Sequence, residues 1–272
     1  MSTWEGDGRP PPPAPRIGLR GWLRVVWRGP LLAGLVFGGL AVLLLVRLVE
    51  QPLYGLHRPV TPRITRAVCR GALRLLNLPL IIRGAPMQSH GAMVANHASW
   101  LDIFALNAGA TLYFVSKAEV AGWPGIGWLA RATGTVFIRR DRRDARAQVA
   151  LLRARLDAGH RLLFFPEGTS TDGRRVLPFK PTLLAALTGD APANDIQPIT
   201  LTYIAPPGED PRFYGWWGDM ALGPHLLKTL AQSPQGRIEV TYHTPVQPAA
   251  YPDRKALAAA LEAQVRSGFQ EG

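Results

Sequence analysis

Cysteine is almost absent from this sequence, since Cys69 is the single one among 272 residues. No intrachain disulfide can form, and zinc ribbons built from several cysteines are excluded. A reducing compartment, or a membrane face directed toward one, is therefore expected. Acidic residues are also few, with 19 Asp and Glu against 31 Lys and Arg. Because 47% of the residues are hydrophobic, a disordered or acidic solvating chain is excluded as well.

The excess of positive charge lies mainly in the first quarter of the chain. Residues 1–75 contain eleven arginines, no lysine and three acidic residues. A basic arm of this kind suits either nucleic acid or an anionic membrane surface. Here the arginines flank an apolar segment instead of covering a folded face, and this favours a membrane.

The N-terminal part divides into two predicted regions. Residues 1–15 carry five prolines and are predicted to be disordered. Residues 16–78 are predicted to form basic amphipathic and hydrophobic helices that anchor the chain to a membrane. The first of these helices begins with arginines at four-residue spacing beside apolar side chains, a pattern typical of an interfacial helix: Arg16, Arg20, Arg24 and Arg28.

An uncharged run over residues 30–46 follows, and Leu48 and Val49 extend it past Arg47. About 20 apolar residues span a bilayer, so this run predicts an anchor that either spans the membrane or enters and returns. A cleaved signal peptide is the alternative, but no small-residue cleavage site follows. Residues 60–78, with four regularly spaced arginines, predict a second helix lying on anionic headgroups, or else an arginine-rich surface helix.

Beyond residue 78, short apolar runs alternate with helical patterns. This alternation predicts an α/β domain over residues 79–272, with a mostly parallel sheet flanked by helices. Strands are expected at residues 79–82, 92–95, 112–115, 135–138, 162–165, 199–204 and 238–242. Helices are expected at residues 100–107, 123–132, 143–158, 182–187, 222–231 and 254–265.

A histidine and an aspartate follow the strand predicted at residues 92–95. His97 and Asp102 are five residues apart, and on one helix they would point about 140° apart, so His97 is expected in the preceding loop. Ser99 and Asp102 fit a capping box, which would turn Asp102 back toward His97. An aspartate can orient a histidine base that takes a proton from a substrate hydroxyl. The alternative is that Asp102 only caps its helix.

The segment after the strand at residues 162–165 is a second candidate. Pro166 and Gly168 force a tight turn, so backbone amides near Gly168 and Thr169 can face an anion or a developing oxyanion. Glu167 can bind a polyol hydroxyl. An ordinary connecting loop is the alternative.

Basic residues mark two more strand ends. The strand at residues 135–138 runs into several arginines, of which Arg139 or Arg140 can bind a phosphate. Lys117 follows another predicted strand, and Lys180 lies in a loop. The alternative for each is solvated surface charge.

Read along the chain, these motifs together resemble the 1-acylglycerol-3-phosphate acyltransferase family, the glycerolipid acyltransferases. The resemblance covers about residues 85–205 and rests on N-H-x-S-W-x-D at 96–102, F-V-S-K-A-E at 114–119 with W-P-G-x-G at 123–127, G-T-V-F-I-x-R at 134–140, F-P-E-G-T at 165–169 and a proline-centred strand at 196–199.

The resemblance implies that His97 is the general base and Asp102 its partner. It also implies an acceptor-binding strand with Gly134, Phe137 and Arg140, and an acceptor-binding turn with Glu167 and Gly168. Three further residues complete the expected substrate-binding set, which includes no metal ligand: Asn96, Lys117 and Thr169.

The function expected from the resemblance is transfer of a fatty acyl group from an acyl thioester to the free hydroxyl of a lysolipid, a 1-acylglycerol-3-phosphate-type acceptor, in membrane lipid biosynthesis. The thioester carrier is acyl carrier protein or coenzyme A, and no other cofactor and no nucleic acid is expected. The protein is expected at a membrane, the bacterial inner membrane, with its active site facing the cytoplasm.

One position departs from the family pattern. The family usually has an arginine after its glutamate-glycine-threonine turn, whereas this chain has Ser170. Ser170, together with residues 167–173 and 214–220, resembles the bacterial branch that acylates lyso-ornithine lipid. Two acceptors therefore stay open, namely 1-acylglycerol-3-phosphate and lyso-ornithine lipid. A lipid hydrolase, for which no G-x-S-x-G motif is present, and a non-catalytic membrane lipid-binding protein are the remaining alternatives.

Overall fold

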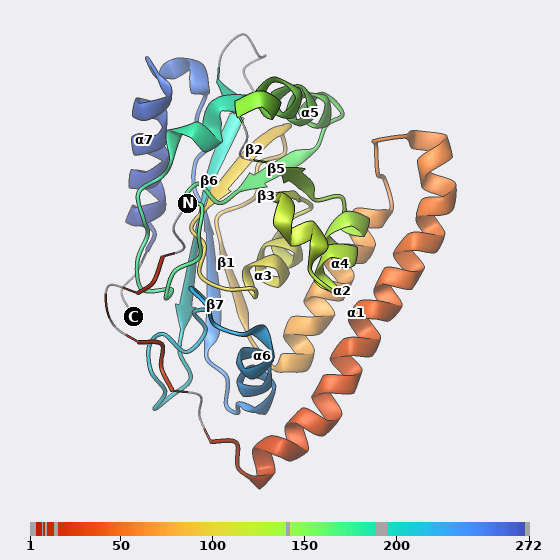
Figure 1. Ribbon diagram of the computed structural model, residues 1–272, viewed down its shortest axis with the longest axis vertical. Helices are drawn as coiled ribbons and strands as arrows, with labels where there is room; N and C mark the ends of the chain where they lie inside the picture. Colours follow the sequence, from red (N-terminus) through yellow and green to blue (C-terminus); the bar gives the residue numbers. More distant parts are fainter. Residues whose placement is uncertain are drawn as a thin grey trace.

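The centre of the computed structural model, which describes residues 4–6, 8, 10–13, 16–139, 142–188 and 195–269, is a seven-stranded sheet. The strand order is β1-β7-β6-β2-β5-β3-β4 (Figure 1). Strands β2 to β6 are parallel to one another, whereas β7 pairs antiparallel with β6 and parallel with β1. The strands are β1 (Leu80–Arg83), β2 (Gly91–Ala95), β3 (Tyr113–Lys117), β4 (Val136–Ile138), β5 (Arg161–Phe164), β6 (Asp195–Ile204) and β7 (Arg237–Tyr242).

The mostly parallel sheet flanked by helices confirms the predicted fold class, and each predicted strand is found close to its expected position. The α-helices are α1 (Leu19–Tyr54), α2 (Thr61–Leu76), α3 (Asp102–Gly109), α4 (Ile126–Thr133), α5 (Ala145–Asp157), α6 (Leu222–Ala231) and α7 (Arg254–Ser267). Short 3₁₀ helices are η1 (Ala118–Gly122), η2 (Arg142–Asp144), η3 (Pro181–Leu187) and η4 (Pro248–Ala250).

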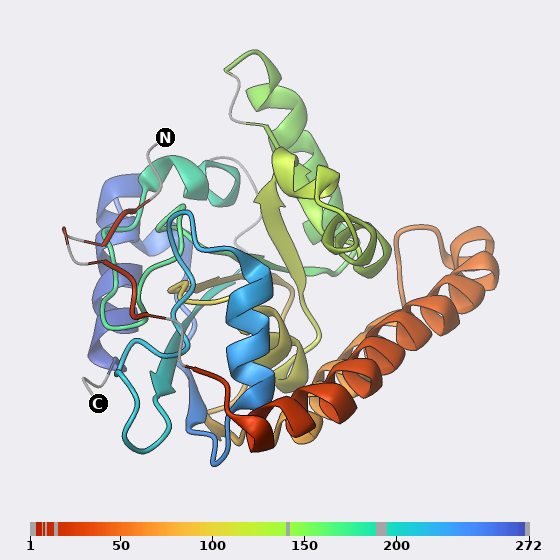
Figure 2. The same ribbon diagram turned by 60° about the horizontal axis from the view of Figure 1, so that its bottom comes forward.

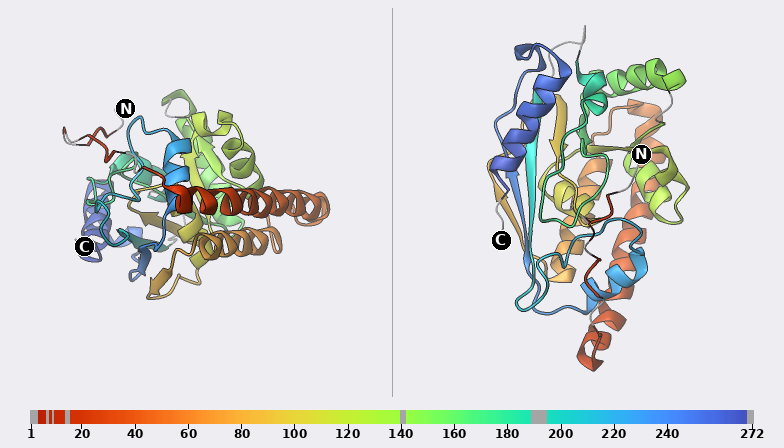
Figure 3. Two further views of the ribbon diagram at one scale, coloured as in Figure 1. Left: turned by 90° about the horizontal axis from the view of Figure 1, so that it is seen from below. Right: turned by 60° about the vertical axis from the view of Figure 1, so that its left-hand side comes forward.

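Alternate side chains of each strand fill two separate cores, one on each face of the sheet. Met93 and Ala95 of β2 belong to the core that α2, α3 and α6 cover. Ala92 and Val94 of the same strand belong to the core that α5 and α7 cover. Because the side-chain period of a strand is two, the uninterrupted apolar run of β2 serves both faces. Figure 3 shows α7 on the opposite side of the sheet from α3 and the N-terminal helices.

The N-terminal region forms a helical hairpin in which α1 and α2 run antiparallel along each other (Figures 1 and 2). The sequence predicts an interfacial helix followed by a separate anchor, but α1 is one 36-residue helix that continues through Pro30. Packing on both sides of Pro30, against α6 before it and α2 after it, holds the axis together although the proline lacks a backbone donor. By length and composition, α1 is suited to crossing a membrane.

Two glycines allow the helices of the hairpin to pack closely. A Cβ atom at Gly39 would lie 2.4 Å from Cγ2 of Val68, and one at Gly71 would lie 3.0 Å from a methyl group of Leu35. Each helix therefore offers a glycine to a branched side chain of the other.

The basic faces of both helices meet protein instead of lipid headgroups at four positions, which corrects the prediction for these residues. Arg24 and Arg28 of α1 donate to backbone carbonyls at the C-terminal end of α6. Arg66 and Arg70 of α2 donate to the last carbonyls of α3. The C-terminal end of a helix has unpaired carbonyls and a partial negative charge, so guanidinium groups stabilise it.

The far end of the hairpin is also tied down. Glu50, near the end of α1, accepts hydrogen bonds from the backbone N–H groups of Val60 and Thr61 at the start of α2. Arg58 in the connecting turn donates to the carbonyl of Ala132 in α4 at 2.9 Å. Both ends of α1 are thus held against the α/β domain.

Part of the segment predicted to be disordered packs on the domain. The Trp4 ring lies 5.9 Å from that of Trp217, and the backbone N–H of Trp4 donates to Thr169 Oγ1 at 3.3 Å. Arg175 also lies over the Trp4 ring. The large aromatic side chain supplies the apolar contact that the neighbouring prolines do not.

Candidate active site

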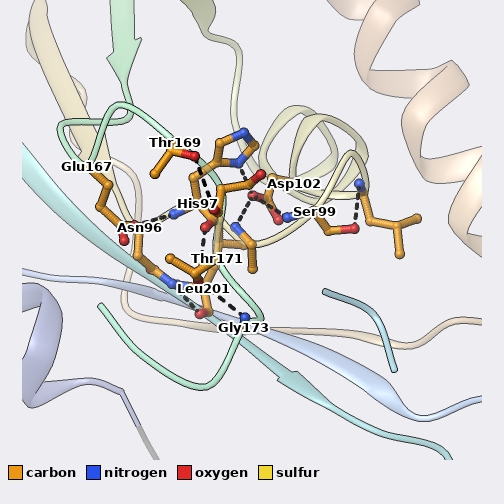
Figure 4. A network of polar contacts seen from close by, with 12 residues as sticks. Asn96, His97, Ser99, Asp102, Glu167, Thr169, Thr171, Gly173 and Leu201 are labelled. Carbon is orange, nitrogen blue, oxygen red and sulfur yellow. Dashed lines mark hydrogen bonds and ion pairs between the residues drawn. The ribbon is translucent and has the colours of Figure 1, made fainter. Parts of the chain in front are cut away.

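The site lies at the carboxyl edge of the parallel strands, where α/β proteins place their chemistry. His97 follows β2, and Asp102 is the first residue of α3. Nδ1 of His97 lies 2.6 Å from Oδ2 of Asp102 (Figure 4). Since the carboxylate accepts, the imidazole carries its proton on Nδ1 and leaves Nε2 as the basic nitrogen. The predicted pairing of these two residues is therefore confirmed.

Four donors surround the carboxylate of Asp102, which is fully buried. Oδ2 also accepts from the backbone N–H groups of Ala98 at 2.9 Å and Ser99 at 3.2 Å. The phenol of Tyr203, at the end of β6, donates to Oδ1 at 2.5 Å. Together these bonds fix the carboxylate in one orientation and compensate for its burial.

The predicted capping box is wrong in its positions, because α3 begins at Asp102 with Leu101 as its N-cap, so Ser99 is not the N-cap residue. Ser99 Oγ accepts from the N–H of Leu101, while the Asp102 carboxylate reaches back to the N–H of Ser99. The bonds from the N–H groups of Ala98 and Ser99 to the Asp102 carboxylate turn this side chain toward the preceding loop, where His97 lies.

The His97 ring is held by its hydrogen bond to Asp102 and by stacking on the aromatic side chain of Phe165. It stacks on Phe165, with ring centroids 4.1 Å apart, and Phe165 in turn lies 6.0 Å from Phe114. The side chain of His97 is 24% exposed. Within the described part of the chain, Nε2 makes no hydrogen bond, so this nitrogen is open to a substrate.

Glu167 supports the His97 loop from the other side. Its Oε1 accepts from the backbone N–H of His97 at 2.6 Å, and its Oε2 from the N–H of Leu177 at 2.8 Å. Glu167 is 1% exposed, and this burial raises its pKa to about 8 although the two backbone bonds lower it. The prediction that Glu167 contacts the acceptor is not supported by this position, because both oxygens are used within the protein.

Asn96 is likewise committed to the fold. Its side chain donates to the carbonyl of Leu201 and accepts from the N–H of the same residue, both at 2.8 Å. It thereby continues the pairing of β2 with β6 beyond the last strand residue. This buried position does not place Asn96 against a substrate.

The turn after β5 has the predicted sharp bend, with a φ of 73° at Gly168. The N–H of Gly168 donates to the carbonyl of Phe165 at 3.0 Å and so does not face an oxyanion. Among the described residues, the N–H of Thr169 has no hydrogen-bond partner. Thr169 is therefore the candidate donor that this turn offers.

The structure does not bring Gly134 to the dyad. Gly134 ends α4 with a φ of 86° and precedes β4, at the amino edge of the sheet. Its carbonyl accepts from Arg155 at 2.7 Å. Phe137 lies within β4 opposite Ser116, and Arg140 lies outside the described residues. Lys117 ends β3 at the same carboxyl edge as His97.

Tyr203 and Phe165 are the contacts of the dyad that sequence reasoning missed. Tyr203 lies 101 residues from Asp102 along the chain, so no local spacing connects the two. Phe165 forms part of a quoted motif, but the stacking of its ring on His97 is a tertiary contact. Among the described residues, no three His, Cys, Asp or Glu side chains come together to hold a metal ion.

The chain is similar to several known acyltransferases. The acyltransferase family model matches residues 81–201. Lyso-ornithine lipid O-acyltransferase of Rhodobacter capsulatus is 58% identical over 98% of this chain and 96% of its own. 1-Acyl-sn-glycerol-3-phosphate acyltransferase of Neisseria gonorrhoeae is 33% identical over 75% and 80%, respectively.

A solved structure has the same fold. The 1-acyl-sn-glycerophosphate acyltransferase PlsC of Thermotoga maritima superposes with a TM-score of 0.67 at 21% identity, over 92% of this chain and 95% of that one. The extent of these matches leads to one conclusion: the chain belongs to the acyltransferase family and is an acyltransferase.

Proposed function

We propose that this enzyme transfers a fatty acyl group from an acyl thioester to the free hydroxyl of lyso-ornithine lipid, at the cytoplasmic face of the bacterial inner membrane. The observation that carries the mechanism is the 2.6 Å hydrogen bond between His97 and the buried Asp102. The 58% identity to a lyso-ornithine lipid O-acyltransferase supports the acceptor. Ser170, in place of the arginine usual in the lysophosphatidate enzymes, agrees with an acceptor that has no phosphate.

In the proposed reaction, Nε2 of His97 takes the proton of the acceptor hydroxyl while its oxygen attacks the thioester carbonyl. The tetrahedral intermediate carries a negative charge, for which the N–H of Thr169 and the ammonium group of Lys117 are the candidate partners. The carbon–sulfur bond then breaks, and His97 returns the proton to the leaving thiolate. The products are the diacylated lipid and the free thiol of the carrier, which is acyl carrier protein or coenzyme A. No other cofactor enters this scheme.

Asp102 has two tasks in this scheme. It selects the tautomer with a free Nε2, and its charge stabilises the imidazolium that forms during the attack. The acyl donor is already activated, so the scheme needs no nucleophilic side chain.

The membrane location is supported by the outer surface of α1. Its exposed side chains include large apolar residues along the whole length of the helix, among them Trp22, Trp27, Phe37, Leu45 and Leu53. Trp123 and Trp128, on and beside α4, are exposed as well. An apolar surface of this extent suits insertion into a lipid leaflet.

The test supplies purified enzyme in mixed vesicles with radiolabelled acyl carrier protein or coenzyme A thioester, and with lyso-ornithine lipid and 1-acylglycerol-3-phosphate in parallel. We expect label in the ornithine lipid. Preferential esterification of 1-acylglycerol-3-phosphate would refute the acceptor assignment.

The variant His97→Ala tests the base separately from the acceptor. Turnover should fall by about 10²- to 10⁴-fold, the usual contribution of a general base. Flotation with vesicles should not change, because the substitution leaves the exposed apolar side chains of α1 in place. Near-normal turnover of this variant would remove His97 from the reaction.

A further inference from the structure

We propose that Tyr203 is a positioning residue of the dyad, whose phenol holds Asp102 in place and limits how strongly this carboxylate stabilises the imidazolium form of His97. The inference rests on the proposed role of His97 as the base. It adds a third side chain to a pair that the sequence motif alone presents as complete.

The two oxygens of Asp102 have separate partners. Oδ2 faces the His97 loop and accepts from Nδ1 of His97 and from two backbone N–H groups. Oδ1 faces the sheet and accepts from Tyr203 at 2.5 Å. Tyr203 comes from the rigid, buried strand β6, whereas His97 comes from a loop. The phenol therefore fixes the carboxylate to the sheet, and the carboxylate fixes the imidazole.

Burial makes this bond electrostatically strong. Tyr203 is 3% exposed and Asp102 is fully buried, so little solvent screens the phenol dipole. Burial raises the pKa of Tyr203 well above its ordinary value, and the charge of Asp102 and the bond to it act in the same direction. Tyr203 consequently remains a neutral donor throughout the pH range in which an enzyme assay is run.

Other titratable groups lie on the elements around the dyad, and Lys117 ends β3 at the same edge of the sheet. Glu167, after β5, bonds the backbone of His97 and interacts with Asp102 through charge. Tyr214, between β6 and α6, packs on the Tyr203 ring. His225 of α6 accepts from Trp100, and α2 places Arg66 and Arg70 at the opposite end of α3 from Asp102. Among these, a side-chain hydrogen bond to Asp102 comes from Tyr203 alone in the described part of the chain.

Loss of the phenol should have two effects. Oδ1 would be left buried without a donor, so the carboxylate and the imidazole would lose their fixed orientation and turnover would fall. The negative charge of Asp102 would also be less shared, so the imidazolium form of His97 would be stabilised. The acid limb of the pH profile of kcat would then move to higher pH, since the base stays protonated longer.

Tyr203→Phe tests this, with Tyr214→Phe as the matched control. The two buried rings lie 5.7 Å apart. The Tyr214 hydroxyl bonds Gln235 and the N–H of Gly236 instead of Asp102. Each variant removes one buried hydroxyl group from this pair of rings. Glu167 is unchanged in both variants, so any titration of Glu167 contributes equally to the two pH profiles.

For Tyr203→Phe we expect kcat to fall by roughly 10- to 100-fold, as for other residues that orient a catalytic group. The KM for the acceptor should stay within about twofold, and the acid limb should move upward by about half a pH unit or more. Tyr214→Phe should keep the acid limb of the parent enzyme. An acid limb in Tyr203→Phe that matches Tyr214→Phe, or that moves to lower pH, would overturn the inference.

Replacing Tyr203 by 3,5-difluorotyrosine should shift the acid limb of the pH profile in the opposite direction to Tyr203→Phe, while the ring is kept. Fluorination makes the phenol a stronger donor, so the acid limb should move to lower pH, whereas an acid limb that is unchanged or moves to higher pH contradicts the inference.

His97→Ala separates the proposed role of Tyr203 from the proposed role of His97 as the base. If this variant is inactive while the tyrosine variants leave the limb unmoved, the base assignment stands and the role of Tyr203 fails. If His97→Ala is active, the base assignment fails first.

Discussion

Two buried carboxyl groups lie on either side of His97 and act on different parts of it. Asp102 binds the imidazole, whereas Glu167 binds the backbone N–H of the same residue. The Asp102 carboxylate accepts four hydrogen bonds, while the Glu167 carboxyl group accepts two. The loop is thus held at its main chain by one carboxyl group and at its side chain by the other.

Glu167 should make stability depend on pH in an unusual direction. The folded chain retains the Glu167 proton up to about pH 8, whereas the unfolded chain releases it near a pKa of 4.5. Between these values the folded state binds more protons, so the free energy of unfolding should fall as pH rises, by at most about 1.4 kcal/mol per pH unit. Glu167→Gln should remove this slope. Urea unfolding of both proteins at several pH values from 5 to 8 measures it, and parallel profiles would contradict the expectation.

At the scale of single residues, the sequence predicted the His97–Asp102 pair because a carboxylate at the start of a helix can fold back onto the loop before it, although the predicted capping box is not formed. It did not predict the task of Glu167, since a turn motif tells where the chain bends but not toward which partners a side chain points. Tyr203 could not be predicted either, because β6 meets α3 only in the folded sheet.

At the scale of elements, arginines at helix ends connect the hairpin to the α/β domain, in addition to the apolar packing of α2 in the core. Arg24 and Arg28 bind the end of α6, Arg58 the end of α4, and Arg66 and Arg70 the end of α3. The four-residue spacing of Arg24 and Arg28, and of Arg66 and Arg70, correctly indicated one face of each helix. It could not show what that face meets, because the same pattern suits anionic headgroups and helix carbonyls alike.

Arg28→Met should therefore weaken the fold. Arg28 is 5% exposed, and its Nη1 donates to two carbonyls at the end of α6. Loss of charged hydrogen bonds of this kind costs about 1.5–3 kcal/mol. Arg20→Met is the control, because Arg20 is exposed on the same face two turns earlier, and it should change stability by less than about 0.5 kcal/mol. Chemical denaturation would contradict the capping role if both variants were equally stable.

Gly39 and Gly38 offer a second matched pair within α1. A side chain at Gly39 collides with Val68 of α2, so Gly39→Leu should cost about 1–3 kcal/mol through separation of the hairpin. A Cβ atom at Gly38 meets nothing within 4 Å, so Gly38→Leu should leave stability unchanged or raise it by up to about 1 kcal/mol, since leucine favours helix. The midpoint of thermal unfolding should fall for Gly39→Leu and should not fall for Gly38→Leu, and equal shifts would contradict the packing described.

On the scale of the whole molecule, α1 is tied to the α/β domain at both ends. Arg28 of α1 is bonded to α6, and Arg58 in the turn after α1 is bonded to α4. The sequence left spanning and re-entrant anchors open, because hydropathy reports how apolar a helix is and not which contacts its ends make. If these contacts persist at a membrane, we expect α1 to lie along one leaflet with its exposed apolar side chains in the lipid.

Cysteine labelling tests this topology. Cys69 is buried, and burial raises the pKa of its thiol to about 12, so it should not react with a maleimide. Cysteines introduced at Gly18 and His57, exposed positions before and after α1, should both react with a membrane-impermeant maleimide from the same side of sealed vesicles. Reaction from opposite sides would show that the helix spans the bilayer.

The short helix α3 connects the N-terminal helical hairpin to the His97–Asp102 pair. Its eight residues measure about 12 Å, with the arginines of α2 at one end and Asp102 at the other. If α1 lies in the leaflet, α3 would hold the imidazole of His97 at a constant height above the lipid. The enzyme would then select among lysolipids by how deeply the hydroxyl group sits in the bilayer, in addition to the chemistry of the headgroup.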